Sequence, residues 1–330
     1  MTKLCSSPLN DLRWVLTSPN MLSSTHKLFR RVSTPSNDEI NFVMKAAMQP
    51  EFAAHLGKRK SHFLGTYFEH LWLFYLKHSP RYELIASNLQ VNEQGKTIGE
   101  FDIIAFDKHE QRYLHQELAI KYYLGHNKPQ ESETRWIGPQ SVDRLDIKVG
   151  KLINQQLRLS ENAAAKNVLQ NLGIKQIEPQ LLIKGCLFQR RQNNALNQIY
   201  DLPDYVDPEH FQATWLPFKE LATQLGHKQS PHDYWKVLEK PEWLAPITLK
   251  ITSIGEYDIM TTEELIIRLI HQQNTNGRAL LISRLNKEKE KGKERGQERL
   301  ISTETIFAVP HCWPLPRKPS PALQATGVNK

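Results

Sequence analysis

Two acidic side chains occupy matching places in two neighbouring apolar runs of this sequence. Asp102 ends the segment "GEFD" at the mouth of the first run, and Glu117 lies inside the second, in "YLHQELAIK". Carboxylates are almost never buried without a partner, because stripping water from an ionised group costs several kcal/mol or more. Either both side chains lie on wet faces of the protein, or something positive lies between them.

Alternate residues of a β-strand share a face, so Glu100 points the same way as Asp102. By the same rule His115 and Lys121 share the face of Glu117. If a hairpin through "DKHEQR" joins the two strands, Asp102 and Glu117 lie close together. Two carboxylates about 5 Å apart repel by roughly 3 kcal/mol at an effective dielectric constant of about 20. A divalent cation converts this repulsion into attraction, and a nearby lysine can orient a phosphate or a water molecule. The residues therefore predict a metal-dependent phosphodiesterase site.

The apolar spacing indicates the elements that would position these side chains. The segment "HFLGTYFEHLWLFYLKHSP" has the strongest helical pattern in the chain, with Glu69 inside it and Pro80 at its end. We expect three strands next, then a second helix and a buried strand, at 82–91, 98–106, 112–124, 140–160 and 179–188. The expected order is therefore α-β-β-β-α-β.

Several segments of the chain resemble a known family. The stretches "DLRWVLTSP", "LGTYFEHLWLFYLKHSPRYELIASNLQV", "GEFDIIAFD", "ELAIKYYL", "WIGPQSVDRLDIKVGKL" and "LLIKGCLF" are similar to a bacterial domain-of-unknown-function family, number eighteen fifty-three, and cover most of the chain. The segments "GEFD" and "YLHQELAIK", in the α-β-β-β-α-β order, also resemble the PD-(D/E)XK nuclease superfamily. This second resemblance implies an α/β fold with a restriction-endonuclease-like core around a central mixed sheet.

With this core in place, the sequence divides into four regions. We predict a helical N-terminal extension at 1–57, a PD-(D/E)XK nuclease-like core at 58–190, a Trp- and Pro-rich C-terminal region packed on the core at 191–285, and a charged segment and tail at 286–330. Helices are expected at 8–57 and 261–273, and short helices at best at 201–246. The run "NKEKEKGKERGQER" (286–299) predicts a solvated helix end or a loop, and "PRKPSPALQATGVNK" a frayed tail.

The superfamily resemblance implies roles for particular residues. Asp102 corresponds to the metal-binding aspartate, and Glu117 to the acidic residue of the (D/E)XK motif, which also binds metal. Glu69 matches an acidic position that some members use as a further ligand. Lys121 stands for the motif lysine, although Ala119 occupies the expected position. Because two residues along a strand span about 6.6 Å, Lys121 must lean back toward Glu117, or a bulge near Ala119 must bring it closer.

The second helix supplies the predicted substrate-binding residues Gln140, Arg144 and Lys148, in "QSVDRLDIKVGK". The resemblance implies that this helix packs beside the third strand. Gln140, at its start, matches a glutamine that several such nucleases use, although the Q-x-x-x-Y signature is absent. Arg144 and Lys148 lie one turn apart and can hold a phosphate, and the alternative is an exposed helix face.

The composition fits a globular protein with a polyanionic partner. The 330 residues are 39% hydrophobic and 24% charged, and the formal net charge of +8 agrees with nucleic acid as the partner. No run approaches the roughly 18–20 apolar residues of a membrane helix, so we expect no membrane association. The start "MTKLCSSPLNDLRW" has no apolar signal region, and the three cysteines form no CxxC, so we expect a reducing cytoplasm.

Two classes of enzyme lack their motifs in this sequence. "HEQRY" has Tyr113 where HExxH needs its second histidine, and "GKERG" lacks the Gly-Lys-Ser/Thr ending of a P-loop. We therefore expect neither a zinc hydrolase nor a nucleotide cofactor.

The predicted function is a nuclease that uses Mg²⁺ or Mn²⁺ to hydrolyse phosphodiester bonds in DNA or RNA, with Asp102, Glu117 and Lys121 as catalytic residues. A catalytically inactive nuclease-like scaffold that binds nucleic acid or a protein partner is the alternative. A third reading makes the two acids ordinary salt-bridge partners of Lys121 and Arg112.

Overall fold

This computed structural model describes residues 7–23, 29–126, 135–191, 200–227, 233–250, 257–275, 277–289 and 298–314. Four helices lie in its N-terminal part. They are α1 (Pro8–Thr17), α2 (Asn37–Ala47), α3 (Pro50–Gly57) and α4 (Leu64–His78). The Ser36 hydroxyl caps α2 by accepting the Glu39 N–H at 3.2 Å. The helix predicted in the aromatic segment is confirmed, and the prediction of helices at 8–57 is confirmed in part, because residues 18–23 and 29–36 are not helical.

Three long antiparallel strands follow α4. They are β2 (Tyr82–Glu93), β3 (Lys96–Asp107) and β4 (Arg112–His126). Gln94 and Gly95 both have positive φ in the first turn, as a tight hairpin between right-twisted strands requires. The second turn brings Asp107 opposite Arg112. The hairpin predicted through "DKHEQR" is therefore confirmed.

The region after β4 differs in detail from the predicted single helix. It contains the short strand β5 (Arg135–Ile137), α5 (Leu145–Lys151), the π-helix η1 (Leu152–Gln156), the 3₁₀ turn η2 (Leu159–Glu161), α6 (Ala163–Asn171) and the buried strand β6 (Glu178–Arg190). The predicted helix at 140–160 is thus a shorter α-helix that widens into a π-helix. The strand predicted at 179–188 is confirmed.

The C-terminal half contains more strands than the sequence indicated. Its elements are β7 (Gln212–Pro217), α7 (Phe218–His227), β8 (Tyr234–Leu238), the 3₁₀ turn η3 (Lys240–Trp243), β9 (Thr248–Lys250), α8 (Thr262–Asn274), β10 (Leu280–Lys289) and β11 (Glu298–Val309). The prediction of short helices at best between 201 and 246 was wrong, because short strands packed on both faces lack a clear alternation.

The charged run at 286–299 also differs from its prediction where the structure describes it. Asn286–Lys289 continue β10, and Glu298 and Arg299 begin β11, so these residues pair as strands and form neither a helix end nor a loop. Charged side chains of alternating sign are compatible with a pair of strands whose faces are exposed to solvent. The predicted tail at 316–330 lies outside the described residues.

One mixed sheet joins both halves of the molecule. Its main path runs β2-β3-β4-β6-β7-β11-β10-β8, while β5 and β9 pair with β4 and β11, and β1 (Arg30–Arg31) pairs with β6. Neighbours are antiparallel at both ends of the path and parallel from β4 through β6 and β7 to β11. The chain is therefore a mixed α/β protein with a large central sheet, as predicted.

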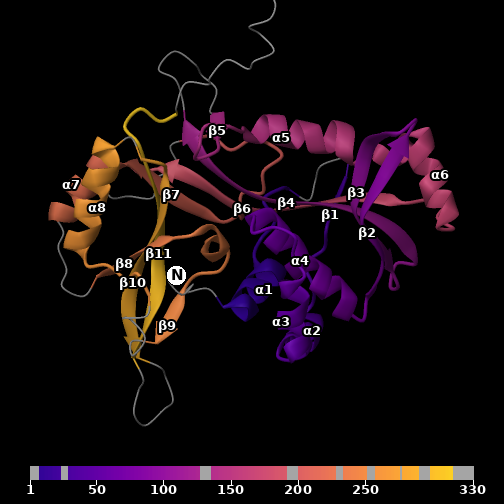
Figure 1. The fold of residues 1–330 in the computed structure, drawn as a ribbon, viewed down its shortest axis with the longest axis horizontal. Coiled ribbons are helices and arrows are strands. Elements are labelled where there is room, and N and C mark those ends of the chain that lie inside the picture. Colours follow the sequence, from indigo (N-terminus) through magenta and orange to yellow (C-terminus); the bar gives the residue numbers. More distant parts are fainter. Residues whose placement is uncertain are drawn as a thin grey trace, which may run out of the picture.

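Helices cover both faces of this sheet. In Figure 1, α1–α4 lie below the line of β4 and β6, whereas α5 lies above it. Separate apolar clusters fill the two sides, one containing Phe68, Trp72 and Ile103, and the other containing Val149, Leu152 and Ile183. Within the described residues, no helix is long and apolar enough to cross a membrane.

Candidate functional site

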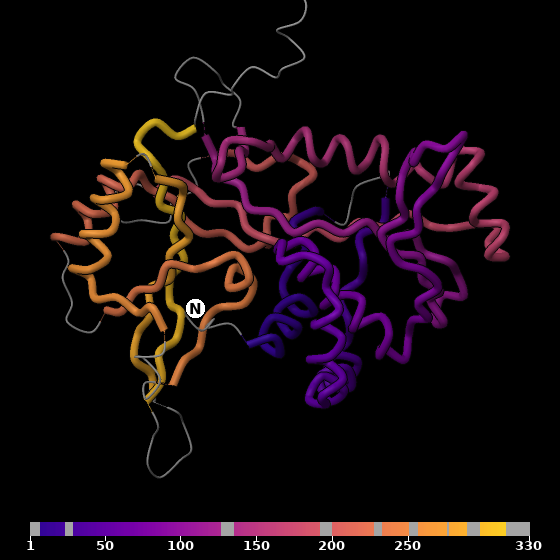
Figure 2. Tube along the Cα trace, viewed as in Figure 1, coloured from indigo at the N-terminus to yellow at the C-terminus, as the bar shows by residue number. Residues whose placement is uncertain are grey.

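The strands β3 and β4 pair at one end and separate at the other. Their register runs from Asp107↔Arg112 to Ile103↔Gln116, although β3 begins at Lys96 and β4 continues to His126. In Figure 2 the β2–β3 hairpin leaves the line that β4 and β6 follow. We call the place of separation, with Asp102, Glu117 and the Leu118 N–H, the fork.

Asp102 is the first residue of β3 beyond the paired register. Its carboxylate replaces the lost backbone partner, because Oδ2 accepts the Leu118 N–H at 3.0 Å. By the alternation of the strands, Asp102 and Glu117 lie opposite each other on the face covered by α5. The structure therefore brings together the two acids that the sequence singled out.

Glu117 is fully buried and is held by two uncharged donors. Its Oε1 lies 2.9 Å from His115 Nε2, and its Oε2 accepts a hydrogen bond from Gln156 Nε2 at 2.8 Å. Burial lowers the pKa of His115 to about 4, so the ring is neutral at pH 7 and its Nε2–H donates to the carboxylate. Neither contact supplies a positive charge.

Burial disfavours the ionised form of both carboxyl groups at the fork. Burial, followed by the charge of Glu117, raises the pKa of Asp102 to about 7. Burial likewise raises the pKa of Glu117 to about 7, although hydrogen bonds with Asp102 and the charge of Lys148 lower it. Because the two groups interact, they titrate as a pair. Among the described residues, no lysine or arginine nitrogen lies within 4.0 Å of either carboxylate.

Lys148 is the cation that faces this pair from α5. Its Nζ donates to Gln156 Oε1 at 3.4 Å, and Gln156 in turn donates to Glu117. Burial and the charge of Lys121 lower the pKa of Lys148, while the charges of Asp102 and Glu117 raise it. Of the three predicted substrate-binding residues, Lys148 is therefore the one that the structure brings to the acids.

The ammonium group of Lys121 contacts Asp143 and neither of the two acids at the fork. Its Nζ donates to Asp143 Oδ2 at 2.9 Å, and the Tyr123 hydroxyl lies 3.4 Å from the same oxygen. The β4–β6 register continues without a shift from Leu114 to Leu124, so the bulge near Ala119 that would carry Lys121 toward Glu117 is absent from this described stretch. The role of Lys121 stays a prediction.

The remaining predicted residues lie at the margin of the fork. Glu69 accepts a hydrogen bond from Asn88 Nδ2 at 2.5 Å. Burial, then the charges of Asp102 and Glu100, raise the pKa of Glu69, so it shares the field of the pair. Gln140 is exposed, and Arg144 donates to Asp146 Oδ1 at 3.0 Å on its own helix.

Sequence reasoning did not assign roles to the two donors that hold Glu117. The signal for His115 was its position two residues before Glu117 on the same strand face. No comparable signal marked Gln156, which lies at the end of the π-helix η1 and donates to Glu117. π-Helical turns of this kind occur frequently at functional sites.

The two carboxylates at the fork are the kind of oxygen ligand that a magnesium ion prefers. Within the described residues, no three His, Cys, Asp or Glu side chains form a ready metal-binding group. Mg²⁺ is commonly bound by one or two carboxylates, with water and substrate phosphate oxygens completing the octahedron. Asp102 and Glu117 could supply two such carboxylates, and the buried, mutually repelling pair gains most from a cation.

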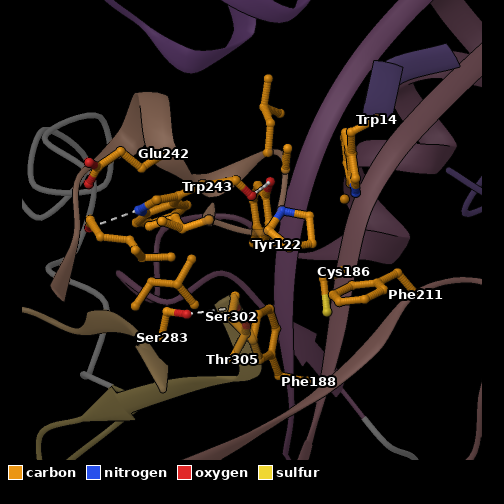
Figure 3. Close-up of a pocket in the computed structure, with 17 residues that line it drawn as sticks. Trp14, Tyr122, Cys186, Phe188, Phe211, Glu242, Trp243, Ser283, Ser302 and Thr305 are labelled. Carbon is orange, nitrogen blue, oxygen red and sulfur yellow. Dashed lines mark hydrogen bonds between the residues drawn. The ribbon is translucent and has the colours of Figure 1, made fainter. Parts of the chain in front are cut away.

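A cavity lies between the two halves of the molecule, away from the fork (Figure 3). Its volume is about 30 Å³, enough for a water molecule or two, and it is lined mostly by apolar side chains. Three of the hydroxyl groups at its wall have partners: the Tyr122 hydroxyl donates to the Trp243 carbonyl at 2.7 Å, and Ser283 and Ser302 share a hydrogen bond of 2.7 Å. This cavity is a packing gap.

Comparisons with known proteins give one match. The model of a family described as domain of unknown function (DUF1853) matches residues 10–301. No curated protein and no solved structure matches the chain.

Proposed function

The chain belongs to the DUF1853 family, and we propose that it is a Mg²⁺-dependent nuclease that hydrolyses phosphodiester bonds in DNA or RNA. The observation that carries this proposal is the convergence of Asp102 and Glu117 at the fork. Two largely buried carboxyl groups share this place without a lysine or arginine within ion-pair distance in the described structure. A divalent cation is the simplest group that would balance them.

We propose further that α4, β2, β3, β4, α5 and β6 form a restriction-endonuclease-like core. Their order along the chain is α-β-β-β-α-β. The antiparallel β2–β3–β4 unit joins β6 in parallel, and α4 and α5 lie on opposite faces. This arrangement supports the assignment of "GEFD" and "QELAIK" as the acidic segments of a nuclease motif.

Asp102 and Glu117 would hold the ion, and Glu69 would add negative charge at its edge. Mg²⁺ bound there would lower the pKa of a bound water and neutralise charge on the phosphate. Asp102 is fixed by the Leu118 N–H, and Glu117 by His115 and Gln156, so both carboxylates are oriented before an ion arrives. Lys148 would lie on the substrate side of the pair.

A nuclease-like scaffold that binds nucleic acid without cutting it is the second candidate. The pairing of Lys121 with Asp143 favours this reading, because the strand lysine is then not available to a phosphate. Such a scaffold would bind through its basic side chains, and its affinity would fall steeply with salt and persist without metal.

Cleavage of labelled DNA and RNA with Mg²⁺ or Mn²⁺ tests the proposal. Wild type should cut at least one of the two, and Asp102→Asn should cut at least about 100-fold more slowly, because an amide is a poor ligand for Mg²⁺. Glu161→Gln is the matched control, since Glu161 is an exposed carboxylate on η2. Equal trace activity in wild type and Asp102→Asn would show that the chain is not a nuclease of this kind.

A further inference from the structure

We propose that Lys148 on α5, and not Lys121 on β4, is the lysine that contacts the substrate phosphate at the fork, and that Gln156 positions it. This inference rests on the proposed function, because it assigns the cation of the same site. Three observations support it. They are the contacts that hold Lys121 away from the two acids, the contacts that hold Lys148 near them, and the π-helix that follows α5.

The pairing of β4 with β6 keeps the backbone of Lys121 four residues along a regular strand from Glu117. Lys121 pairs with Gly185 of β6, and a Cβ at Gly185 would lie 1.7 Å from the Lys121 carbonyl oxygen. Gly185 has φ +129°, a conformation that other residues rarely adopt. The two strands therefore approach closely at this point, and the close fit leaves no slack for a bulge that would move Lys121 toward the acids.

Asp143 then fixes the far end of Lys121. The Nζ–Oδ2 distance is 2.9 Å, and both side chains are partly exposed. Asp143 Oδ1 in turn lies against Gly138, where a Cβ would come within 2.1 Å. Lys121 is thus part of the contact between β4 and the turn that leads into α5.

Gln156 links Lys148 directly to Glu117. Its amide oxygen accepts from Lys148 Nζ at 3.4 Å, and its amide nitrogen donates to Glu117 Oε2 at 2.8 Å. An amide can bridge the two because it offers both an acceptor and donors. One side chain therefore orients the acid and the lysine together.

The π-helix explains how Gln156 reaches this place. Residues 152–156 follow α5 without a break, and the Leu157 N–H bonds to the Leu152 carbonyl at 2.9 Å, five residues back. This wider turn rotates the residues that follow it relative to a regular α-helix. Leu152 and Ile153 stay buried in the core while Gln156 turns toward the strands.

The charges agree with this geometry. Burial and then the charge of Lys121 lower the pKa of Lys148, while the two acids raise it, and Lys148 in turn lowers the pKa of Glu117. Lys148 is also partly buried, so its ammonium group loses hydration that a phosphate oxygen could replace. A lysine from the helix can thus serve where Ala119 stands at the motif position.

Two assays on the full chain test the proposal. The first is single-turnover cleavage in Mn²⁺, and the second is the affinity for a fluorescein-labelled DNA oligonucleotide in EDTA, measured by anisotropy. The variants are Lys148→Met, Lys148→Arg and Lys121→Met. Lys166→Met, an exposed lysine on α6, is the control for lost positive charge.

Lys148→Met should slow cleavage about 100-fold and weaken oligonucleotide binding about tenfold, because a charge-assisted contact to phosphate is lost. Lys148→Arg should restore most of the binding. Lys121→Met and Lys166→Met should stay within about twofold of wild type in both assays.

The two proposals fail in different ways. Wild type that cuts neither nucleic acid overturns the nuclease, while a binding defect confined to Lys148→Met still supports Lys148 as the phosphate contact. Cleavage or binding that depends on Lys121 and is unchanged in Lys148→Met overturns the role of Lys148 alone. Equal losses in Lys148→Met and Lys166→Met also overturn it, because they indicate only a diffuse positive field.

Discussion

Two of the regions in which this molecule buries carboxylates balance the negative charge in different ways. At the fork, Asp102 and Glu117 face each other and are held by the Leu118 N–H, His115 and Gln156. At the second region, which we call the junction, Asp11, Tyr67, Lys236, Glu242 and the Ala245 N–H link the N-terminal helices to the C-terminal half.

The junction satisfies its acids with protein groups. Asp11 accepts the Tyr67 hydroxyl at 2.7 Å and the Ala245 N–H at 3.3 Å. Glu242 lies 3.4 Å from Lys236 Nζ and accepts the Glu239 N–H at 2.9 Å. Burial still raises the pKa of Asp11 to about 6. A raised carboxyl pKa is therefore not by itself a sign of a functional site.

What distinguishes the fork is that two carboxyl groups meet there with no lysine or arginine within ion-pair distance in the described structure. Lys148 acts on the pair through Gln156 and not by direct contact. A buried ion pair is expensive to break, whereas two acids without an ion pair are destabilising until something positive arrives. We therefore interpret the junction as a structural contact and propose the fork as a cation site.

The largest expected effect is at the junction. Lys236→Met removes the cation that lies 3.4 Å from the fully buried Glu242 and should lower the free energy of unfolding by about 3–5 kcal/mol. Chemical denaturation measures this change. The double variant Lys236→Met/Glu242→Met should recover most of the loss, because both charges are then removed. A loss below about 1 kcal/mol for the single variant would show that the junction is not held by this pair.

The fork should respond to substitution in the opposite direction. Asp102→Asn removes one of two repelling charges, and its amide oxygen can still accept the Leu118 N–H. The pKa of Asp102 is raised from 3.8 to about 7, so between these values the folded chain keeps a proton that the unfolded chain has lost. The free energy of unfolding contributed by Asp102 therefore falls as pH rises from about 4 to about 7.

Asp102→Asn lacks this titration, so it should match wild type near pH 4 and exceed it at pH 8 by on the order of 2 kcal/mol. Glu117, whose pKa is also raised, adds to the same trend. His115 opposes it between about pH 4 and its usual pKa of 6.5, because there the unfolded chain keeps a proton that the folded chain has lost. Subtracting wild type from the variant at each pH gives the contribution of Asp102 together with its coupling to Glu117. A variant less stable than wild type at pH 8 would show instead that the ionised Asp102 carboxylate stabilises the folded chain, as we expect of Glu242 at the junction.

A smaller effect should follow from removing a donor at the fork. Gln156→Leu takes away the hydrogen bond to Glu117 Oε2 and should weaken Mn²⁺ binding about tenfold, as the loss of a ligand's supporting contact commonly does. Gln155→Leu is the matched control, since Gln155 is exposed on the same π-helix. Equal affinities in the two variants, measured by titration calorimetry, would contradict the positioning role of Gln156.

The sequence was most informative where patterns are local. The aromatic helix, the hairpin through "DKHEQR" and the buried strand β6 follow from apolar spacing and turn residues, and their predictions are confirmed. The convergence of Asp102 and Glu117 was also predictable, because alternation and one short hairpin determine it. Long-range strand pairing, such as β7 with β11, left no comparable signal.

The surroundings of the pair were less predictable. Gln156 depends on a π-helix that no residue pattern announces, and the Lys121–Asp143 contact depends on how the turn before α5 folds back. Both arise from packing between elements far apart in the sequence. Such contacts are set by tertiary structure, which composition and periodicity do not encode.

Titration calorimetry with Mn²⁺ tests the central claim most directly, because it measures the ion itself at the fork. We expect wild type and Glu161→Gln to bind an ion at equal affinity, and Asp102→Asn to lose that binding event. If wild type gives no binding heat beyond dilution, or if Asp102→Asn binds as wild type does, then the two acids do not form a cation site.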